Sequence, residues 1–409
     1  MNWLRRLGRN RLLDVGAAVI AGWAVVRLVM VLLGPADRDD FAHYYVAGCL
    51  FNAGRDPYVV LDPVAAEFGV KFSEHLPVHV APNPPPFLWM ISPFARLPLR
   101  AAYAAWMGLS LLALVVVVTV SCRLLEDRWS RRGRYFFVMG VLAAAPVYWH
   151  FMYGQVGLIL AALVLVGYAW HRRGWAGAGC VAVATAGLLK IFPWVLLPWF
   201  VWRGPGRWQR AMVTGAFIVG VSWASGWDLW VSFRQQSLPL VAEQSLNQSF
   251  NYTVPSFVMN LQLAATQQTW LMLGSATGLV LLAGVYAFCW WRDGDREVEF
   301  ALLCLVMLIA SIRSWGHYLV MLIFPIAVAL ESVRGRPTVP RVLWVGCAVA
   351  LVNVTGTMTS PWLDQHLVVK VLVNYFPLYG LVLLGGLLVS ELSRNGSASG
   401  SKSQMCRSE

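Results

Sequence analysis

Long apolar runs, separated by short polar or basic segments, repeat along almost the whole chain of 409 residues. A run of about 18 or more apolar residues is long enough to cross a bilayer as a helix. The pattern predicts twelve helices, at residues 12–34, 99–122, 135–151, 154–171, 175–189, 191–203, 209–226, 269–291, 298–312, 315–331, 341–358 and 367–391. We therefore expect an all-α polytopic membrane protein with about 12 transmembrane helices.

The first apolar run, at 12–34, follows four arginines and so has the general form of a signal peptide. It is longer than the apolar core of a typical signal peptide, and no obvious cleavage site of small residues accompanies it. We interpret this run as a first helix that the protein retains.

The Lys and Arg residues concentrate on one side of the predicted helices, in the short connecting segments and at both ends of the chain. Cytoplasmic loops carry such an excess of positive charge, so we predict cytoplasmic N- and C-termini. The long loops 35–98 and 227–268 then lie on the outer side. We expect residues 1–391 to form a single domain that functions on this side. The Ser- and Gly-rich segment 392–409 is predicted to be a disordered cytoplasmic tail.

The composition agrees with a membrane protein, because 58% of the residues are hydrophobic and only 13% are charged. The net charge of +12 comes mostly from basic residues beside the helices, so the expected partner is the lipid bilayer and not a nucleic acid. Seven cysteines are scattered without the paired spacing of a metal site. Nucleotide-binding and zinc-protease motifs are absent, and we expect neither a metal nor a cofactor.

The first outer loop contains two segments that are helical in pattern but too short to span a bilayer. Residues 41–53 have helical spacing and end at Gly54, a residue that commonly stops a helix. We expect this helix to lie along the membrane interface. Residues 84–92 begin with three prolines and continue as an apolar run, which predicts a re-entrant half-helix dipping into the membrane.

Asp40 is the first candidate for chemistry, because it directly precedes the aromatic helix of the first outer loop. A carboxylate near membrane cover can act as a general base toward a hydroxyl group. Its alternative role is to cap the helix, and the two roles are compatible. Asp37 and Asp39 are interpreted as solvated loop residues, although either is an alternative base.

Lys190 is the second candidate, because it interrupts the apolar run Leu188-Leu189-Lys190-Ile191-Phe192-Pro193. A charge within a membrane segment is costly and commonly marks a functional site. A lysine at this place is a suitable point charge for a phosphate group. The alternative is that its side chain extends to the outer interface and has no binding role.

Arg313 and His317 lie at the same predicted outer level, among Trp315 and Tyr318. Together with Lys190 they form a candidate site for an anionic lipid headgroup. The alternative is an ordinary aromatic belt with interfacial cations. In the second outer loop, Asn247 and Gln248 are neutral hydrogen-bonding residues of a kind that suits sugar hydroxyls.

In their order along the chain, several short motifs resemble those of the polytopic glycosyltransferases of the C superfamily (GT-C), specifically family 87. That family includes polyprenyl-phosphate-mannose-dependent mannosyltransferases and a related arabinofuranosyltransferase. The matching pieces extend from about residue 36 to residue 325. They are Asp40-Phe41, Tyr44-Tyr45, Gly54, Pro57-Tyr58, Asn83-Pro84-Pro85, Pro93, Leu97-Pro98, Gly154-Gln155, Lys190 with Pro193, Asn247-Gln248-Ser249 and Trp315-Gly316-His317-Tyr318.

The resemblance implies a transferase of the bacterial plasma membrane that works in the cell envelope. Its donor would be a polyprenyl-phosphate sugar and its acceptor a glycolipid or polysaccharide on the extracytoplasmic face. Asp40 would be the general base of an inverting displacement. Lys190, Arg313 and His317 would bind the donor phosphate. Acceptor or sugar contacts would come from Tyr45, Tyr58, Asn247 and Gln248.

The sugar stays open between a hexose and a pentose. Mannosyltransferase members usually carry an Asp-Leu-x-Val-Tyr-Arg type of motif in the first loop, where this chain has Asp40-Phe41-Ala42-His43-Tyr44-Tyr45.

A multi-spanning transporter or flippase of an anionic or lipid-linked substrate is the competing interpretation, and a scaffold protein is a third. Twelve helices with both ends inside, some of them broken, also suit a transporter. The chain has no detectable similarity between its halves, however, and its first outer loop is unusually long. Its polar residues gather at the outer level and not at the middle of the membrane, which favours a transferase.

Overall fold

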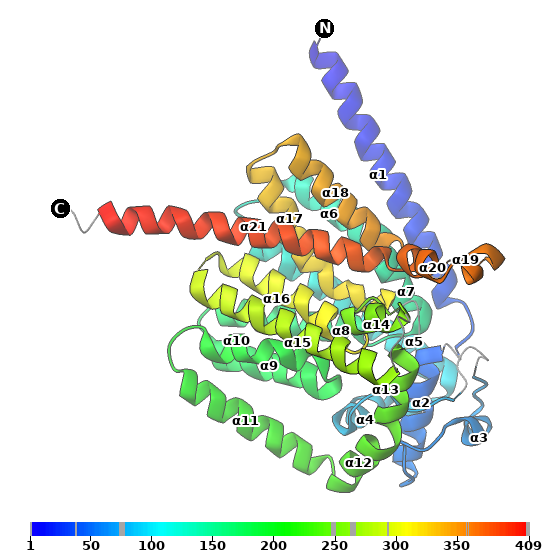
Figure 1. Cartoon of the computed structure of the whole chain (residues 1–409). Helices are drawn as coiled ribbons and strands as arrows, with labels where there is room; N and C mark the ends of the chain where they lie inside the picture. The colour runs from blue at the N-terminus through cyan, green and yellow to red at the C-terminus, as the bar shows by residue number, and fades with distance from the viewer. Residues whose placement is uncertain are drawn as a thin grey trace.

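The computed structural model describes residues 2–36, 39–72, 78–246, 251–261, 267–292, 294–356, 358 and 360–405 (Figure 1). Across these residues the chain is helical almost throughout. The described ranges contain one pairing of extended backbone, an isolated antiparallel bridge between Asn251 and Trp315. The prediction of an all-α protein is therefore confirmed.

Each predicted apolar range corresponds to one helix or to two consecutive helices. Where a range is divided, a proline lies in the first turn of at least one of the two parts, because proline lacks the N–H that a helix interior needs. The observed helices are α1 (Asn2–Leu32), α5 (Leu99–Leu124), α6 (Arg131–Ala143) with α7 (Ala145–Tyr153), α8 (Gly157–Arg172), α9 (Ala176–Leu189), η3 (Phe192–Leu196) with α10 (Leu197–Trp202), α11 (Arg207–Ala224), α15 (Gln267–Arg292), α16 (Arg296–Ala310), η5 (Gly316–Leu322) with α17 (Ile323–Gly335), α18 (Val339–Asn353), and α20 (Leu367–Asn374) with α21 (Phe376–Met405).

Fewer helices than the predicted twelve are long and apolar enough to span a membrane. Five helices in the described part of the chain are long and apolar enough to cross a membrane, or six if α6 and α7, bent by 44°, count as one span. Helices α8, α9 and α18 are apolar but shorter. The count of about 12 is therefore not confirmed, because the pattern of the sequence shows apolar runs but not where each helix breaks.

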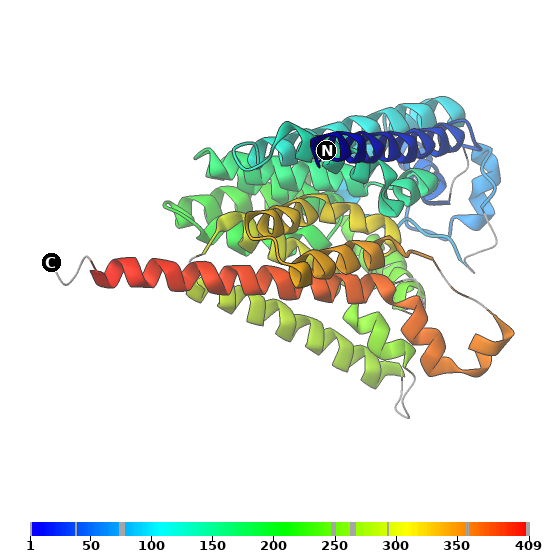
Figure 2. The same ribbon diagram turned by 90° about the horizontal axis from the view of Figure 1, so that it is seen from above.

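The short helices of the first outer loop lie at one end of the bundle. Figures 1 and 2 show α2 (Asp39–Asn52) and α3 (Asp62–Ala65) at this end together with α19 (Pro361–Gln365) and α20, and we call it the loop end. Helix α1 runs toward the loop end and α21 runs away from it, so both termini point away from it. Helix α21 is helical to Met405, and disorder of the segment 392–409 stays a prediction.

Helix α2 and helix α4 (Pro85–Ile91) confirm the two short helices predicted in the first outer loop. The chain leaves α2 through Gly54, which has a φ of 68°. The segment after residue 226 is also helical, as α12 (Trp227–Ser232), the π-helix η4 (Phe233–Ser237) and α13 (Leu238–Leu246). The remaining elements are η1 (Ala66–Phe68), η2 (Phe94–Arg96) and α14 (Val254–Asn260).

Helix α2 is buried on every side, whereas an interfacial helix would expose one face. From Asp40 to Leu50 every residue is buried. Phe41 packs edge-on against Tyr103 of α5, with ring centroids 5.4 Å apart, and Tyr44 packs against Phe87 of α4 at 4.7 Å. A helix that is apolar all round is stable only when it is enclosed. The enclosure holds α2, and with it Asp40, in a fixed place.

Gly154 permits a close approach between the end of α7 and α2. It ends α7 with a φ of 65°, and its carbonyl oxygen accepts a hydrogen bond of 2.8 Å from the Trp106 indole. A Cβ at this position would lie 2.6 Å from the Cβ of Phe41.

We expect Gly154→Ala to destabilise the protein by about 1–3 kcal/mol, because it adds left-handed strain and a contact with α2. Thermal unfolding in detergent measures the effect. Gly174→Ala is the matched control, since Gly174 has a φ of 88° but nothing within 4 Å of its Cβ position. Equal melting temperatures for the two variants would contradict the role of the close approach.

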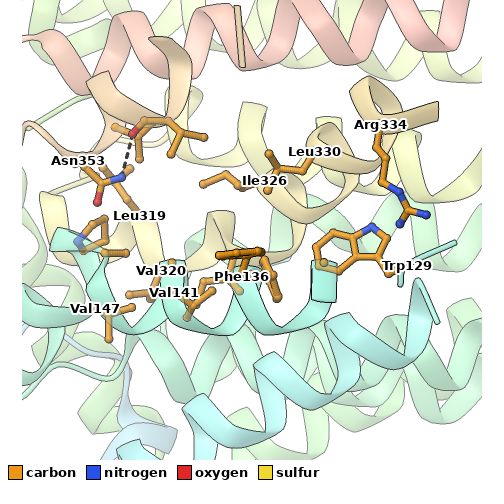
Figure 3. A pocket seen from close by; sticks show the side chains of 18 residues that line it. Trp129, Phe136, Val141, Val147, Leu319, Val320, Ile326, Leu330, Arg334 and Asn353 are labelled. Carbon is orange, nitrogen blue, oxygen red and sulfur yellow. Dashed lines mark hydrogen bonds between the residues drawn. The ribbon is translucent and has the colours of Figure 1, made fainter. Parts of the chain in front are cut away.

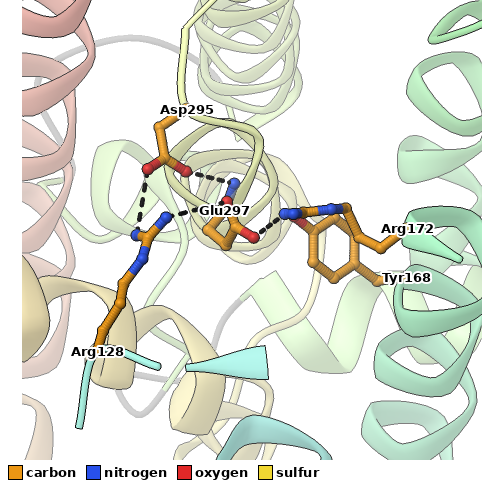
Figure 4. Close-up of polar contacts among 5 residues, drawn as sticks. All are labelled: Arg128, Tyr168, Arg172, Asp295 and Glu297. Carbon is orange, nitrogen blue, oxygen red and sulfur yellow. Dashed lines mark hydrogen bonds and ion pairs between the residues drawn. The ribbon is translucent and has the colours of Figure 1, made fainter. Parts of the chain in front are cut away.

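At the opposite end of the bundle, ion pairs join the ends of α5, α8 and α16 (Figure 4). Arg128, after α5, bonds Asp295 at 3.2 Å, and Arg172, at the end of α8, pairs with Glu297. Glu299 of α16 is fully buried, where it accepts hydrogen bonds from Arg203 and from the Trp199 indole. Each buried carboxylate is thus compensated by a guanidinium, as burial of a charge requires.

Candidate active site

Asp40 lies in the first turn of α2, and the whole residue is only 4% exposed. Its Oδ1 atom is 4.0 Å from Nδ1 of His43, one turn along the same helix. It also interacts electrostatically with Lys190 and Tyr318. Asp37 and the side chain of Asp39 lie outside the described part of the structure. The carboxylate that the sequence singled out is therefore enclosed and faces cationic and polar groups.

Lys190 is buried and interacts electrostatically with Asp40. Helix α9 ends at Leu189, directly before Lys190, whose φ of −159° is extended backbone, and Pro193 lies in the first turn of η3. The side-chain Nζ lies 4.7 Å from the centroid of the Tyr318 ring. Because Lys190 is only 8% exposed, it does not reach an aqueous surface as the alternative interpretation required. Its charge instead interacts with those of Asp40 and Arg313.

Arg313 lies in the segment between α16 and η5, with its guanidinium carbon 3.4 Å from the centroid of the Trp315 ring. The amide of Asn251 fixes the backbone on both sides of it. Asn251 Nδ2 donates to the Ile312 carbonyl at 2.8 Å, and Asn251 Oδ1 accepts from the Ser314 N–H at 2.7 Å. The second long loop thereby holds the arginine in place.

His317 is 1% exposed and packs edge-on against the rings of Tyr153 and Tyr318, at 5.6 and 4.4 Å. It interacts electrostatically with Lys190, Arg313 and His150. The structure therefore brings together Asp40, Lys190, Arg313 and His317, which come from three separate parts of the chain. We call these four residues the charged cluster. The role of each one stays a prediction.

The structure adds residues to which the sequence alone gave no role. The Tyr44 hydroxyl donates a 3.0 Å hydrogen bond to Gln155 Oε1, and both side chains are buried. Burial, together with the nearby Asp40, raises the pKa of Tyr44 well above its usual value, so the phenol stays protonated. For His43 the sequence does contain a signal. It lies three residues after Asp40, and residues three apart share one face of a helix, so the two side chains are expected to be close. No pattern in the sequence linked Tyr44 with Gln155.

Several buried polar atoms around the charged cluster have no hydrogen-bond partner among the described residues. They are both ring nitrogens of His43, both ring nitrogens of His150, Gln155 Nε2, Arg313 Nε, His317 Nε2 and the Tyr318 hydroxyl. A buried donor or acceptor left unpaired costs about 1–3 kcal/mol. So many unpaired polar atoms in one place indicate a site whose partners come from a ligand.

The other predicted site residues are not part of this group. The Tyr45 hydroxyl donates to the Leu97 carbonyl at 2.9 Å, and the Tyr58 hydroxyl donates to the Asn83 carbonyl at 3.0 Å. Both hydroxyls therefore hold protein backbone in this structure, and sugar contacts by these tyrosines stay a prediction. Asn247 and Gln248 lie outside the described residues. Over the described ranges, no three His, Cys, Asp or Glu side chains are grouped closely enough to hold a metal ion.

An apolar groove leads toward the charged cluster along α6, α7, α17 and α18 (Figure 3). Its volume is about 330 Å³. Trp129 and Arg334 lie at one end, and Val147, Leu319 and Asn353 lie at the other. Val147 is one helical turn before His150, and Leu319 is two residues after His317. One end of the groove is therefore lined by residues that are close in sequence to His150 and His317.

Comparison with known proteins agrees with this chemistry. The sequence model of glycosyltransferase family 87 matches residues 82–325. The polyprenol-phosphate-mannose-dependent alpha-(1-2)-phosphatidylinositol mannoside mannosyltransferase of Mycobacterium tuberculosis is 24% identical over 311 residues, which are 69% of each chain.

Two crystal structures of ArnT from Cupriavidus metallidurans, one bound to undecaprenyl phosphate and one in the apo state, also match. Both are 16% identical and cover 94% of this chain. They match over 79% and 78% of the ArnT chain, with TM-scores of 0.43 and 0.41 respectively. The family match carries more weight, since it extends over more than half of the present chain and includes Lys190, Arg313 and His317. The protein is thus a member of glycosyltransferase family 87.

Proposed function

We propose that this glycosyltransferase moves a hexosyl or pentosyl unit from a polyprenyl-phosphate sugar to a glycolipid or glycan acceptor. The observation that carries the proposal is the charged cluster, in which one buried carboxylate faces two buried or partly buried cations and a histidine. A carboxylate suits the acceptor hydroxyl, and the cations suit the phosphate of the donor. The name of the mycobacterial relative supports a mannosyl donor and a phosphatidylinositol mannoside acceptor.

In the proposed reaction Asp40 takes the proton of the acceptor hydroxyl. The hydroxyl oxygen forms a bond to the anomeric carbon as the bond from that carbon to the phosphate oxygen breaks. The electron pair of the broken bond stays on the polyprenyl phosphate, whose increased negative charge Lys190, Arg313 and His317 stabilise. A single displacement of this kind inverts the anomeric configuration. None of these steps requires a metal ion.

The apolar groove is the proposed place for the first prenyl units of the donor. A lipid tail in the groove would put its phosphate beside His150 and His317, because the groove ends one helical turn from them. Each buried CH₂ group contributes about 0.8 kcal/mol to binding. On this proposal the groove would favour a donor with a long prenyl chain over a soluble phosphate.

Filling the groove should weaken binding of long-chain donors only. We expect Ile326→Trp, within the groove wall, to raise KM for a long polyprenyl donor about tenfold, equivalent to roughly 1.4 kcal/mol. KM for a donor with one or two prenyl units should change less than twofold. Val382→Trp, at an exposed position of α21, is the matched control. An equal rise in KM for both donors would refute the placement of the tail.

We also propose that the loop end is extracytoplasmic and that both termini are cytoplasmic, with about 12 membrane-spanning segments in a bacterial plasma membrane. On this proposal the loops 35–98 and 227–268 provide the active-site side. Two observations support it. Both terminal helices point away from the loop end, and the ion-paired basic residues Arg128, Arg172 and Arg203 lie at the opposite end.

The test of the proposed function is a transfer assay with purified protein in liposomes. The protein is offered polyprenol-phosphate-mannose or polyprenol-phosphate-arabinose with a phosphatidylinositol mannoside or another glycolipid as acceptor. Transfer from one donor supports the proposal and identifies the sugar. Transfer from neither donor would contradict it and would favour a transporter or flippase, which movement of fluorescent lipid-linked substrate across the same liposomes would detect.

A further inference from the structure

A row of ionisable side chains leads from Asp40 toward solvent. His43 is 4.0 Å from Asp40, the rings of His43 and His79 have centroids 5.1 Å apart, and His79 Nδ1 is 2.7 Å from Asp62 Oδ1. The row begins at a residue that is 4% exposed and ends at a carboxylate whose side chain is 41% exposed. The row therefore leads from the enclosed base to an exposed carboxylate, although His43 makes no hydrogen bond to its neighbours among the described residues.

The outer part of the row is a carboxylate–histidine pair with a defined direction. The Asp62 carboxylate accepts a second bond of 2.9 Å from the His79 backbone N–H, and the His79 carbonyl accepts one from the Leu61 N–H at 2.8 Å. An ionised carboxylate against Nδ1 keeps the proton on that nitrogen, so Nε2 is left as the acceptor. Burial raises the pKa of Asp62, but the two hydrogen bonds from His79 outweigh burial and lower the pKa below its usual value. Asp62 therefore stays ionised at neutral pH.

The inner part of the row is His43, a buried residue of α2. Neither of its ring nitrogens has a hydrogen-bond partner among the described residues. Its ring packs 5.0 Å from Phe72, which in turn stacks on His79 at 4.4 Å with an interplanar angle of 6°. The charged or titratable groups that face it are Asp40 on its own helix, His79 and Arg313. Burial, His79 and Arg313 lower the pKa of His43 well below its usual value. The neutral ring can therefore accept a proton at one nitrogen while it gives one up at the other.

We propose that His43, His79 and Asp62 form a proton relay that returns Asp40 to its ionised form after each transfer. The proton that Asp40 takes from the acceptor hydroxyl passes to His43, and the proton on the opposite nitrogen of His43 passes to His79. His79 gives its Nδ1 proton to Asp62, which releases it to water. Each ring ends with the number of protons with which it began. The proposal rests on the proposed function in one respect, since it takes Asp40 to be the base.

The relay gives the buried Asp40 a route by which it can lose its proton. A carboxylate enclosed by protein and by two lipid substrates has no water to which it can lose its proton. If the proton stayed on Asp40, the next acceptor hydroxyl would meet a neutral acid that cannot activate it. A merely structural role for the Asp62–His79 pair, as an anchor of the loop around them, predicts loss of stability and nothing specific to protons.

The first test is steady-state transfer by Asp62→Asn, His79→Asn and His43→Asn, with Asp228→Asn and His366→Asn as matched controls on exposed side chains. General acid–base groups contribute about 10²–10⁴-fold. A residue that acts through another contributes less, so we expect kcat to fall about tenfold with KM unchanged. The solvent deuterium isotope effect on kcat should increase in the three relay variants, because proton release becomes rate-limiting. Isotope effects that stay the same as in the wild type would overturn the relay. A fall in kcat that is accompanied in each variant by a fall in melting temperature, with no change in the isotope effect, would also overturn it.

The second test needs no substrate and so separates the relay from the identity of the donor. After a rapid pH jump, infrared spectroscopy follows protonation of Asp40 through the carboxyl band that Asp40→Asn lacks. We expect this protonation to be about tenfold slower in His43→Asn and Asp62→Asn than in the wild type or in the two control variants, as for the transfer rate. Equal rates in all variants would overturn the relay, even if sugar transfer were confirmed. Slower rates in a protein that transfers neither sugar would support the relay and refute only the proposed donor.

Discussion

Asp40→Asn should reduce sugar transfer at least about a hundredfold, because it removes the group that takes the proton from the acceptor hydroxyl. The amide has nearly the same shape as the carboxylate, so the packing of α2 around Phe41 and Tyr44 is preserved. The loss should appear in kcat, while KM for both substrates changes little. The measurement is transfer of radiolabelled sugar to the glycolipid acceptor in liposomes.

Two further variants define the interpretation of this result. Asp228→Asn makes the same chemical change on an exposed side chain and should retain full activity. Asp40→Glu keeps the charge but moves it by about one methylene group, so partial activity is expected, since a misplaced catalytic group is costly. If Asp40→Asn remained active with an unchanged melting temperature, the base would have to be Asp37 or Asp39.

Lys190→Met should lower kcat about 10²–10³-fold, as removal of one charge-stabilising donor typically does. The negative charge on the phosphate grows as the bond to the sugar breaks, so the lysine stabilises the transition state more than the bound donor. Methionine has a similar length and no charge, and therefore fits the same buried space. The change should leave the melting temperature unchanged or raise it, because a buried charge is lost.

This opposite behaviour of activity and stability distinguishes a binding role from a structural one. Lys370→Met, outside the charged cluster, is the matched control and should alter neither quantity. A fall in melting temperature by Lys190→Met, with activity lost in proportion, would mean that Lys190 holds the fold together through Asp40. In that case the donor phosphate would be held by Arg313 and His317 without it.

The sequence predicted most of the helices, and it singled out Asp40, Lys190, Arg313 and His317, which the structure places near one another. Apolar runs indicate helices because both the bilayer and the protein core bury apolar side chains. Lys190 was recognisable because it places a charge within such a run. The breaks were harder to predict. Helices α6 and α7 form an angle of 44°, with Pro146 in the first turn of α7, but a proline in the sequence does not show how far the chain bends there. The count of membrane spans depends on those breaks and therefore could not be fixed.

The pairing of Asp62 with His79 could not be predicted from sequence, because residues 17 apart in a loop share no periodic relation. The family resemblance implied a sugar or acceptor contact for Tyr45. Five residues after Asp40, Tyr45 lies on another face of α2, where its hydroxyl donates to the Leu97 carbonyl, and the contact stays a prediction.

The two hydrogen bonds that Asn251 makes around Arg313 limit which insertions and deletions the chain can tolerate. Asn251 and Tyr252 bond Ser314 through side chain and backbone respectively, and Thr253 caps α14 immediately afterwards. A single residue added between Asn251 and Thr253 would turn the amide away from the arginine segment. In related chains, length variation in the second long loop should therefore fall before residue 251 and not between 251 and 253.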